Sequence, residues 1–161
     1  MDKTAEIVAT LAAKGLKVAI AESLTGGAIA AALVSVAGAS AVLDEAMITY
    51  SNAAKVARLG VLQTTLDTYG AVSPQTAQEM AAGIARTANA RIGLATTGIA
   101  GPGGGTPQKP VGLVYIALHV DGNTTARKFN FYGDRQAIIN QTVFQSLQLL
   151  GGFYDCNRKT N

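Results

Sequence analysis

Residues 17–36, KVAIAESLTGGAIAAALVSV, decide the fold of this chain. Residues 17–21 are apolar after Lys17, which is typical of a short buried strand, and the alanine-rich second half favours a helix up to about residue 36. The turn ESLTGG (residues 22–27) lies between them. Because a buried strand that feeds directly into a helix is the building unit of α/β proteins, this stretch predicts an α/β domain.

The remainder of the chain alternates between the same two kinds of element. Further helices are predicted over residues 4–14, 52–59, 74–88 and 134–150, the third with Ser73 as its N-cap. Further strands are predicted over residues 42–50, 92–97, 111–120 and 124–131, the last two joined by a turn. We therefore expect a three-layer α/β/α sandwich around a mixed, mostly parallel sheet. It forms a single domain over residues 1–161, with a tail from about residue 151.

The composition bears on partners. Hydrophobic residues make up 48% of the 161 residues and charged residues only 14%. Because charge is this sparse, we expect part of the apolar surface to meet another subunit, in a homo-oligomer that is a dimer or higher. The net charge of +3 comes from basic residues spread along the chain. Nucleic-acid binders gather such residues on one face, so no nucleic-acid partner is expected.

The amino terminus and the single cysteine indicate the cellular compartment of the protein. The first residues, MDKTAE, are charged, and no apolar stretch is long enough to span a membrane. Cys156 is the only cysteine, so no intramolecular disulfide and no multi-cysteine metal site is expected. We therefore expect a cytoplasmic protein with no membrane partner.

Ser23 is the first candidate for chemistry, because it follows the predicted strand and precedes the glycines of the turn. A helix amino terminus presents unpaired N–H groups and a dipole that favours an anion, and glycine leaves room for a ligand. Ser23 is therefore a candidate nucleophile beside an oxyanion site, with Thr25, Gly26 and Gly27 as candidate substrate-binding residues. The alternative is that Ser23 or Thr25 simply caps the helix.

A second polar cluster, TYSNAAK (residues 49–55), follows the strand predicted over residues 42–50. It contains Tyr50 and Lys55. Burial lowers the pKa of a lysine, and a neutral lysine can act as general base for a serine. Lys55 is thus the candidate base for Ser23, and an ordinary exposed helix lysine is the alternative. The only histidine, His119, lies in a predicted strand without an evident acidic partner, so the sequence does not support a Ser-His-Asp triad.

The glycine-rich segment TTGIAGPGGGTP (residues 96–107) follows another predicted strand. Its amides can cradle a phosphate, but it matches neither the nucleotide P-loop nor the dinucleotide fingerprint. A flexible hairpin loop is the alternative. Arg135 opens the last predicted helix, where it can clamp a phosphate or carboxylate of a substrate, or pair with Asp134 or another surface acid.

Five sequence blocks follow one another along the chain: AESLTGG (21–27), TYSN (49–52) with Lys55, GAVS (70–73), TGIAGP (97–102) and KPVG (109–112). Together they resemble the ordered motif set of the CinA carboxy-terminal domain family, over roughly residues 4–150. The resemblance implies a nicotinamide mononucleotide amidohydrolase that releases ammonia and leaves nicotinate mononucleotide. It also implies Ser23 as nucleophile, Lys55 as base, Tyr50 as a supporting donor, and Thr97 with Gly98 as part of the ligand-holding wall, with no metal or cofactor.

This implied activity fits the residues, because amide hydrolysis needs an activated nucleophile, an oxyanion site and a proton for the leaving ammonia. We expect a metal-independent serine amidohydrolase that acts on a small nucleotide substrate. It would act alone, without the larger amino-terminal domain that many family members carry. The competing hypothesis is a nonhydrolytic nucleotide-binding or partner-binding module of the competence/damage-inducible type. A pure binder would have no need to combine Ser23, Tyr50 and Lys55, so this set favours the enzyme.

Overall fold

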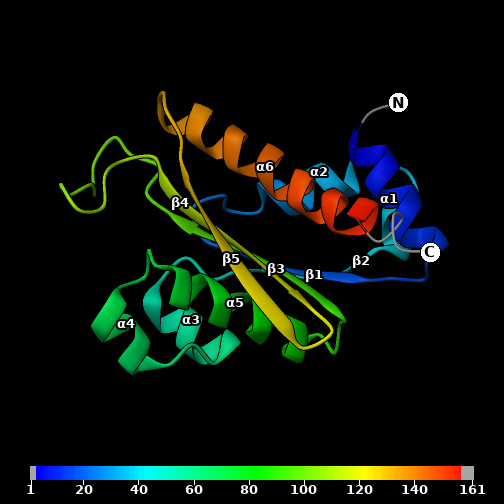
Figure 1. Ribbon diagram of the computed structural model, residues 1–161, viewed down its shortest axis with the longest axis horizontal. Coiled ribbons are helices and arrows are strands. Elements are labelled where there is room, and N and C mark those ends of the chain that lie inside the picture. The colour runs from blue at the N-terminus through cyan, green and yellow to red at the C-terminus, as the bar shows by residue number, and fades with distance from the viewer. Residues whose placement is uncertain (1–2, 157–161) are drawn as a thin grey trace.

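Five strands form one sheet in the order β2-β1-β3-β4-β5 in the computed structural model, which describes residues 3–156 (Figure 1). The strands are β1 (Val18–Glu22), β2 (Leu43–Ile48), β3 (Ile92–Gly98), β4 (Leu113–Val120) and β5 (Asn123–Asn130). β1 pairs in parallel with both β2 and β3, whereas β3–β4 and β4–β5 are antiparallel. The expected mixed sheet is confirmed, and its parallel part is the group β2-β1-β3.

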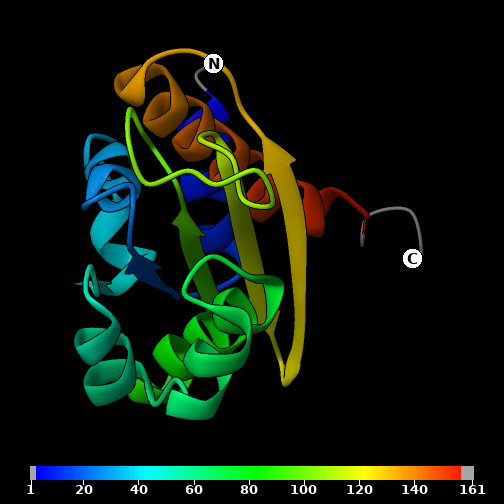
Figure 2. The same cartoon turned by 90° about the vertical axis from the view of Figure 1, so that its left-hand side faces the viewer.

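Helices cover both faces of the sheet, which gives the expected three layers (Figure 2). One layer contains α1 (Lys3–Ala13), α2 (Ala28–Val34) and α6 (Arg135–Cys156). The other contains α3 (Asn52–Leu59), α4 (Gln63–Tyr69) and α5 (Pro74–Thr87). A short 3-10 turn, η1 (Ala39–Ala41), precedes β2. Among residues 3–156, no helix has the length and apolar character needed to cross a membrane.

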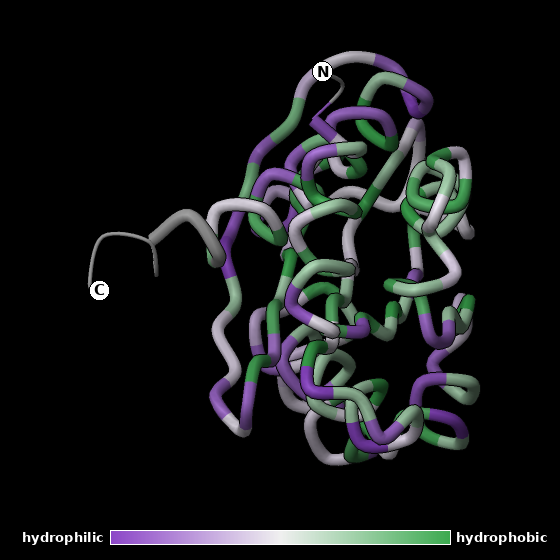
Figure 3. Tube along the Cα trace, turned by 90° about the vertical axis from the view of Figure 1, so that its right-hand side faces the viewer, coloured by the Kyte–Doolittle hydropathy of each residue, from purple (hydrophilic) through white to green (hydrophobic). Residues whose placement is uncertain are grey.

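Two apolar clusters form the core, one on each face of the sheet. On β1, Val18 and Ile20 belong to the cluster under α1, α2 and α6, whereas Ala19 and Ala21 belong to the cluster under α3 and α5. This alternation follows from the two-residue period of a strand, and burial on both faces explains the continuous apolar run. Figure 3 shows the contrast with the edge strand β5, whose residues are mostly hydrophilic.

The turn from β1 into α2 depends on its two glycines. Gly26 and Gly27 have φ values of 58° and 102°, a region in which side chains with a Cβ are strained. Most of the predicted elements lie where the sequence indicates, and Ser73 caps α5 by accepting a hydrogen bond from the Thr76 amide at 3.1 Å. Ordinary capping and periodicity therefore account for most of the fold.

Two parts of the fold differ from the sequence-based expectation. Helix α4 is absent from the prediction, since its start has no side-chain cap and its sequence, QTTLDTY, is mostly polar. The last helix continues to Cys156. Residues 151–156 are therefore helical, and the tail expected there is wrong. A Cβ at Gly151 would lie 3.0 Å from Ile7 Cγ1, so this glycine allows α6 to pack closely on α1 instead of ending the helix. Residues 157–161 lie outside the described part of the chain.

Candidate active site

The carboxyl ends of the three parallel strands meet at one edge of the sheet, where ligands of α/β proteins commonly bind. Ser23 directly follows β1, and its amide donates to the Thr96 carbonyl oxygen of β3 at 3.2 Å. On the other side, the Thr49 amide donates to the Glu22 carbonyl oxygen at 2.9 Å. These backbone bonds fix Ser23 between the ends of its two neighbouring strands.

Lys55 reaches Ser23 from the first turn of α3. Ser51 caps this helix by accepting a hydrogen bond from the Ala54 amide at 3.1 Å. The lysine side chain is 1% exposed, and Nζ lies 3.0 Å from Ser23 Oγ. Nζ also donates to the carbonyl oxygens of Thr49, at 2.8 Å, and Tyr50, at 3.3 Å. The structure thus brings the predicted nucleophile and base together.

Burial lowers the pKa of the Lys55 amine from 10.5 to about 8, because the charged form loses its hydration. A neutral amine has two hydrogens and one lone pair. If the hydrogens stay on the two carbonyl oxygens, the lone pair faces Ser23 Oγ. The backbone of Thr49 and Tyr50 therefore orients Lys55 to accept the proton of the serine hydroxyl.

Tyr50 contributes two groups in different directions. Its carbonyl oxygen contacts Lys55, whereas its half-exposed side chain places Oη 2.9 Å from Arg135 Nη2. Arg135 Nη1 donates to the Gly101 carbonyl oxygen at 2.8 Å. The alternative pairing of Arg135 with Asp134 is not present, since Asp134 Oδ1 instead accepts from the Ala137 amide at the start of α6. Arg135 thus connects α6 to Tyr50, two residues after β2, and to the glycine-rich loop.

These residues line a cavity of about 280 Å³. The lining residues include Ser23 and Lys55, Arg135, and residues 98–101, 103 and 104 of the glycine-rich segment. Thr97 and Gly98, the expected ligand wall, line it as well, and Thr97 Oγ1 donates to the Ala71 carbonyl oxygen at 2.8 Å. The cavity therefore gathers groups from five separate parts of the chain.

Thr25, Gly26 and Gly27 do not belong to this lining, although they were expected to bind substrate. Thr25 is buried, and its Oγ1 lies 3.0 Å from Thr96 Oγ1, which ties the turn to β3. A Cβ at Gly27 would lie 3.2 Å from Ile48 Cδ1. These three residues shape the turn that positions Ser23.

The buried carboxylate of Glu22 occupies the amino terminus of α2. It accepts hydrogen bonds from the amides of Gly27, Ile29 and Ala30 at 2.9–3.1 Å. The expectation that these amides hold an oxyanion is wrong, because Glu22 already satisfies them. An acidic residue at the end of an otherwise apolar strand, just before a helix start, is the sequence signal that reveals this partner.

Other backbone amides belong to residues that line the cavity. These residues are Leu24, which follows Ser23, and Ala100 and Gly101 of the glycine-rich loop. None of the hydrogen bonds found within residues 3–156 uses their N–H groups. They are the available donors for a negative oxygen. Residue type alone does not reveal such donors, because every residue but proline carries an amide.

Two further expectations concern His119 and metal-binding side chains. His119 lies on β4, where its Nδ1 is 2.7 Å from Thr124 Oγ1 of β5, so it is a strand residue of the hairpin, as expected. Within the described range, no three or more His, Cys, Asp or Glu side chains are grouped so that they could hold a metal ion.

The comparisons with known proteins give a consistent result. Residues 1–153 match the family model of the CinA C-terminal domain. A CinA-like protein from Kosmotoga olearia is 53% identical over 146 residues, which are 90% of this chain and 35% of that protein. The chain spans about a third of the length of the curated relatives it matches.

Solved structures match over nearly their whole length. A CinA superfamily protein from Klebsiella pneumoniae has a TM-score of 0.91 and 37% identity, covering 94% of each chain. A competence/damage inducible protein from Agrobacterium tumefaciens has a TM-score of 0.85 and 44% identity, covering 93% of this chain and 94% of that one. Together with the five ordered motifs and the fold, these matches show that the chain belongs to the CinA C-terminal domain family.

Proposed function

We propose that this protein hydrolyses the carboxamide of nicotinamide mononucleotide, giving nicotinate mononucleotide and ammonia, with Ser23 as nucleophile and Lys55 as base. The observation that carries the proposal is the 3.0 Å contact between Lys55 Nζ and Ser23 Oγ in a site where burial lowers the pKa of the lysine. The resemblance of the motif set suggests the substrate. The comparisons show the family of this chain, but they name no substrate.

The first half of the reaction forms an acyl-enzyme. Ser23 Oγ attacks the carboxamide carbon while neutral Lys55 takes the hydroxyl proton, and the carbonyl electron pair moves onto oxygen. The amides of Leu24, Ala100 or Gly101 stabilise that oxygen. The lysine then passes its proton to the nitrogen, the carbon–nitrogen bond breaks, and ammonia leaves an ester on Ser23.

In the second half, water is the nucleophile and Ser23 is the leaving group. Lys55, neutral again, takes a proton from a water molecule that attacks the ester carbon. The bond to Ser23 Oγ breaks, the serine regains its proton from the lysine, and the acid product leaves. Each proton that Lys55 accepts is returned within the same half-reaction, so this scheme needs no further acid or base.

The phosphate of the substrate would bind beside Arg135, which lines the same cavity. The guanidinium uses one nitrogen for Gly101 and another for Tyr50, and it carries more N–H donors than these two contacts need. The amides of the glycine-rich loop add uncharged donors at the same rim. Arg135 would thus bind the anionic end while Ser23 meets the carboxamide.

Ammonia release from nicotinamide mononucleotide tests the proposal. With chelator present, wild-type protein should release ammonia, Ser23→Ala should lose at least about a thousandfold in kcat, and Lys55→Met at least about a hundredfold. Ser40→Ala, at an exposed position outside the cavity lining, is the matched control and should keep full activity.

A folded wild-type protein that binds the nucleotide but releases no ammonia would instead support the nonhydrolytic module. Full turnover by Ser23→Ala would exclude Ser23 as the nucleophile. Circular dichroism of each variant separates a loss of chemistry from a loss of folding.

A further inference from the structure

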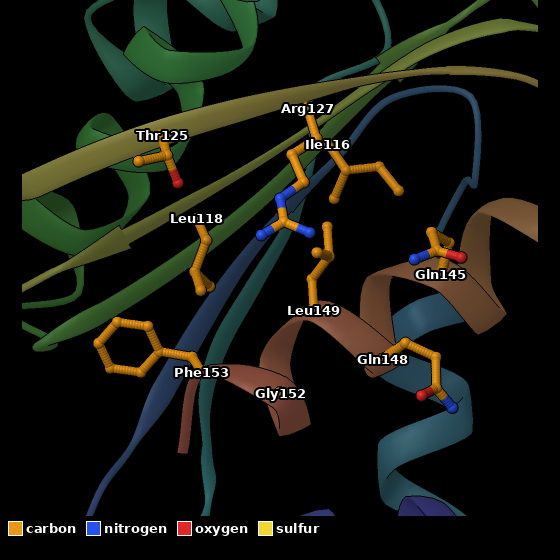
Figure 4. A pocket seen from close by; sticks show the side chains of 9 residues that line it. All are labelled: Ile116, Leu118, Thr125, Arg127, Gln145, Gln148, Leu149, Gly152 and Phe153. Atoms are coloured by element: carbon orange, nitrogen blue, oxygen red, sulfur yellow. The ribbon is translucent and has the colours of Figure 1, made fainter. Parts of the chain in front are cut away.

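A second cavity, of about 370 Å³, lies between the β4–β5 hairpin and the carboxyl-terminal half of α6 (Figure 4). It shares no lining residue with the cavity that contains Ser23. Its volume falls within the range of about 300–1,000 Å³ that is usual for small-molecule sites. We call it the hairpin groove, and nothing in the proposed reaction uses it.

Among the described residues that line the hairpin groove, Arg127 is the one with a charged side chain. It pairs with Ile116 across the β4–β5 ladder, on the face of the sheet that α6 covers. Figure 4 shows its guanidinium extending over the space between Leu118 and Leu149. Among the residues whose side chains the structure describes, 3–153, no hydrogen bond or ion pair involves this guanidinium, and no acidic residue lines the groove. Within that range, the positive charge presented to the groove has no partner.

The floor beneath Arg127 is apolar. Ile116 and Leu118 of β4 are among the buried core residues, and both line the groove together with Leu149 of α6. The rim adds uncharged polar groups, and Figure 4 shows the Gln145 amide turned toward the groove from α6. An apolar floor with one cation and an amide donor complements a molecule that has an apolar body and a single negative group.

We propose that the hairpin groove binds a small amphipathic carboxylate. Its carboxylate pairs with the Arg127 guanidinium through two parallel hydrogen bonds, and its apolar body covers Ile116, Leu118 and Leu149. A neutral apolar molecule would leave the guanidinium unpaired beneath it. A compact inorganic anion would leave the floor in contact with water. The amphipathic carboxylate satisfies both parts of the surface.

The adjacent residue offers a matched control. Lys128 follows Arg127 on β5, so its side chain points to the opposite face of the sheet, and it does not line the groove. Both side chains are exposed, so neither substitution should disturb the core. Arg127→Gln and Lys128→Gln remove the same net charge from neighbouring positions, and only the first removes it from the groove.

Titration calorimetry with 1-naphthoate tests the proposal on the intact chain. Wild-type protein should bind one equivalent saturably, Arg127→Gln should bind at least about tenfold more weakly, and Lys128→Gln should stay within about twofold of wild type. The neutral isostere 1-naphthalenemethanol should bind wild type at least about tenfold more weakly than the acid. Because the two cavities share no lining residue, this pattern assigns the ligand to the groove.

Absence of saturable binding, or equal weakening in the two variants, would overturn the proposal. So would a preference for the neutral alcohol. Sedimentation velocity on the same samples covers the other possible occupant: if Arg127→Gln lowers the assembly mass, the groove is a contact between copies of this chain and not a ligand site. None of these readouts depends on amide hydrolysis, so they stand whether or not the proposed reaction occurs.

Discussion

Lys55 is buried against two carbonyl oxygens and a hydroxyl, and no carboxylate is among its hydrogen-bond partners. A carboxylate would hold the amine protonated and raise its pKa, whereas neutral carbonyl groups accept hydrogen bonds without that effect. Desolvation therefore dominates, and the pKa falls to about 8. The same contacts that orient the amine leave it able to accept a proton near neutral pH.

The pH dependence of the proposed reaction follows from this pKa. Lys55 acts as a base only when neutral, so kcat/KM should rise with pH through about 8 and level off above it. Initial rates of ammonia release between about pH 6 and about pH 10 measure the profile. A flat profile, or a rate that falls through this range, would contradict the role of Lys55.

Glu22 should matter for stability as well as for positioning Ser23. In Glu22→Gln, one carbonyl oxygen and an NH₂ group replace two charged acceptors that serve three amides. We expect a loss of at least about 2 kcal/mol in the free energy of unfolding, measured by urea titration. Glu6→Gln, at an exposed position of α1, should lose about 0.5 kcal/mol or less. Equal losses in the two variants would show that the three amide contacts contribute little.

The elements were predictable where local signals decide them. The apolar run of β1, the two glycines before α2 and the Ser73-Pro74 start of α5 each carry a local physical reason. Helix α4 and the last turns of α6 carry none. Their ends depend on packing against other elements, as Gly151 against Ile7 shows, and single-sequence patterns do not contain that information.

The same division holds for the candidate site. Ser23 and Lys55 stand out by residue type and motif, and the structure places them in contact. The carbonyl oxygens of Thr49 and Tyr50, and the Glu22 carboxylate on the α2 amides, were missed. The two carbonyl contacts depend on how a strand end and a helix start meet in space, so only the folded chain reveals them. For Glu22 there was a sequence signal, an acidic residue between an apolar strand and a helix start, which the prediction did not use.

The approach of α5 to the sheet depends on Gly93. A Cβ at this position would overlap the Ala81 carbonyl oxygen, which belongs to a helix backbone and cannot rotate away. Gly93→Ala should therefore destabilise the protein by about 1–3 kcal/mol in urea titration. Gly152→Ala is the control, and the opposite effect is expected. A Cβ at Gly152 of α6 would meet open space, so this variant should gain about 0.5–1 kcal/mol in the free energy of unfolding. Gly93→Ala with unchanged stability would mean that α5 shifts without penalty.

For the whole molecule, we expect a homo-oligomer, a dimer or higher, and the exposed aromatic residues suggest where its contact lies. The side chains of Tyr132 and Phe144 are 82% and 61% exposed. Gln141, one turn before Phe144 on α6, donates to the Tyr132 carbonyl oxygen at 2.7 Å, so the backbone at Tyr132 lies beside the part of α6 that carries Phe144. Exposed aromatic groups of this kind are typical of contacts between subunits.

Light scattering at micromolar concentration measures the assembly directly. Wild-type protein should have a multiple of the 16.4 kDa chain mass, and Tyr132→Glu with Phe144→Glu should lower it toward the monomer. Leu62→Glu changes another exposed apolar residue, 59% exposed before α4, and should leave the mass unchanged. A monomeric wild-type protein would contradict the expectation.

The contact of Arg135 with Tyr50 joins residues 85 positions apart in the chain. During translation, Ser23 and Lys55 leave the ribosome early, whereas Arg135 emerges only after the whole sheet has been synthesised. A nascent chain therefore carries the proposed nucleophile and base well before it can complete the rim of the cavity. Under the proposed function, the growing polypeptide would acquire its reactive groups first and its contact for the nucleotide phosphate last.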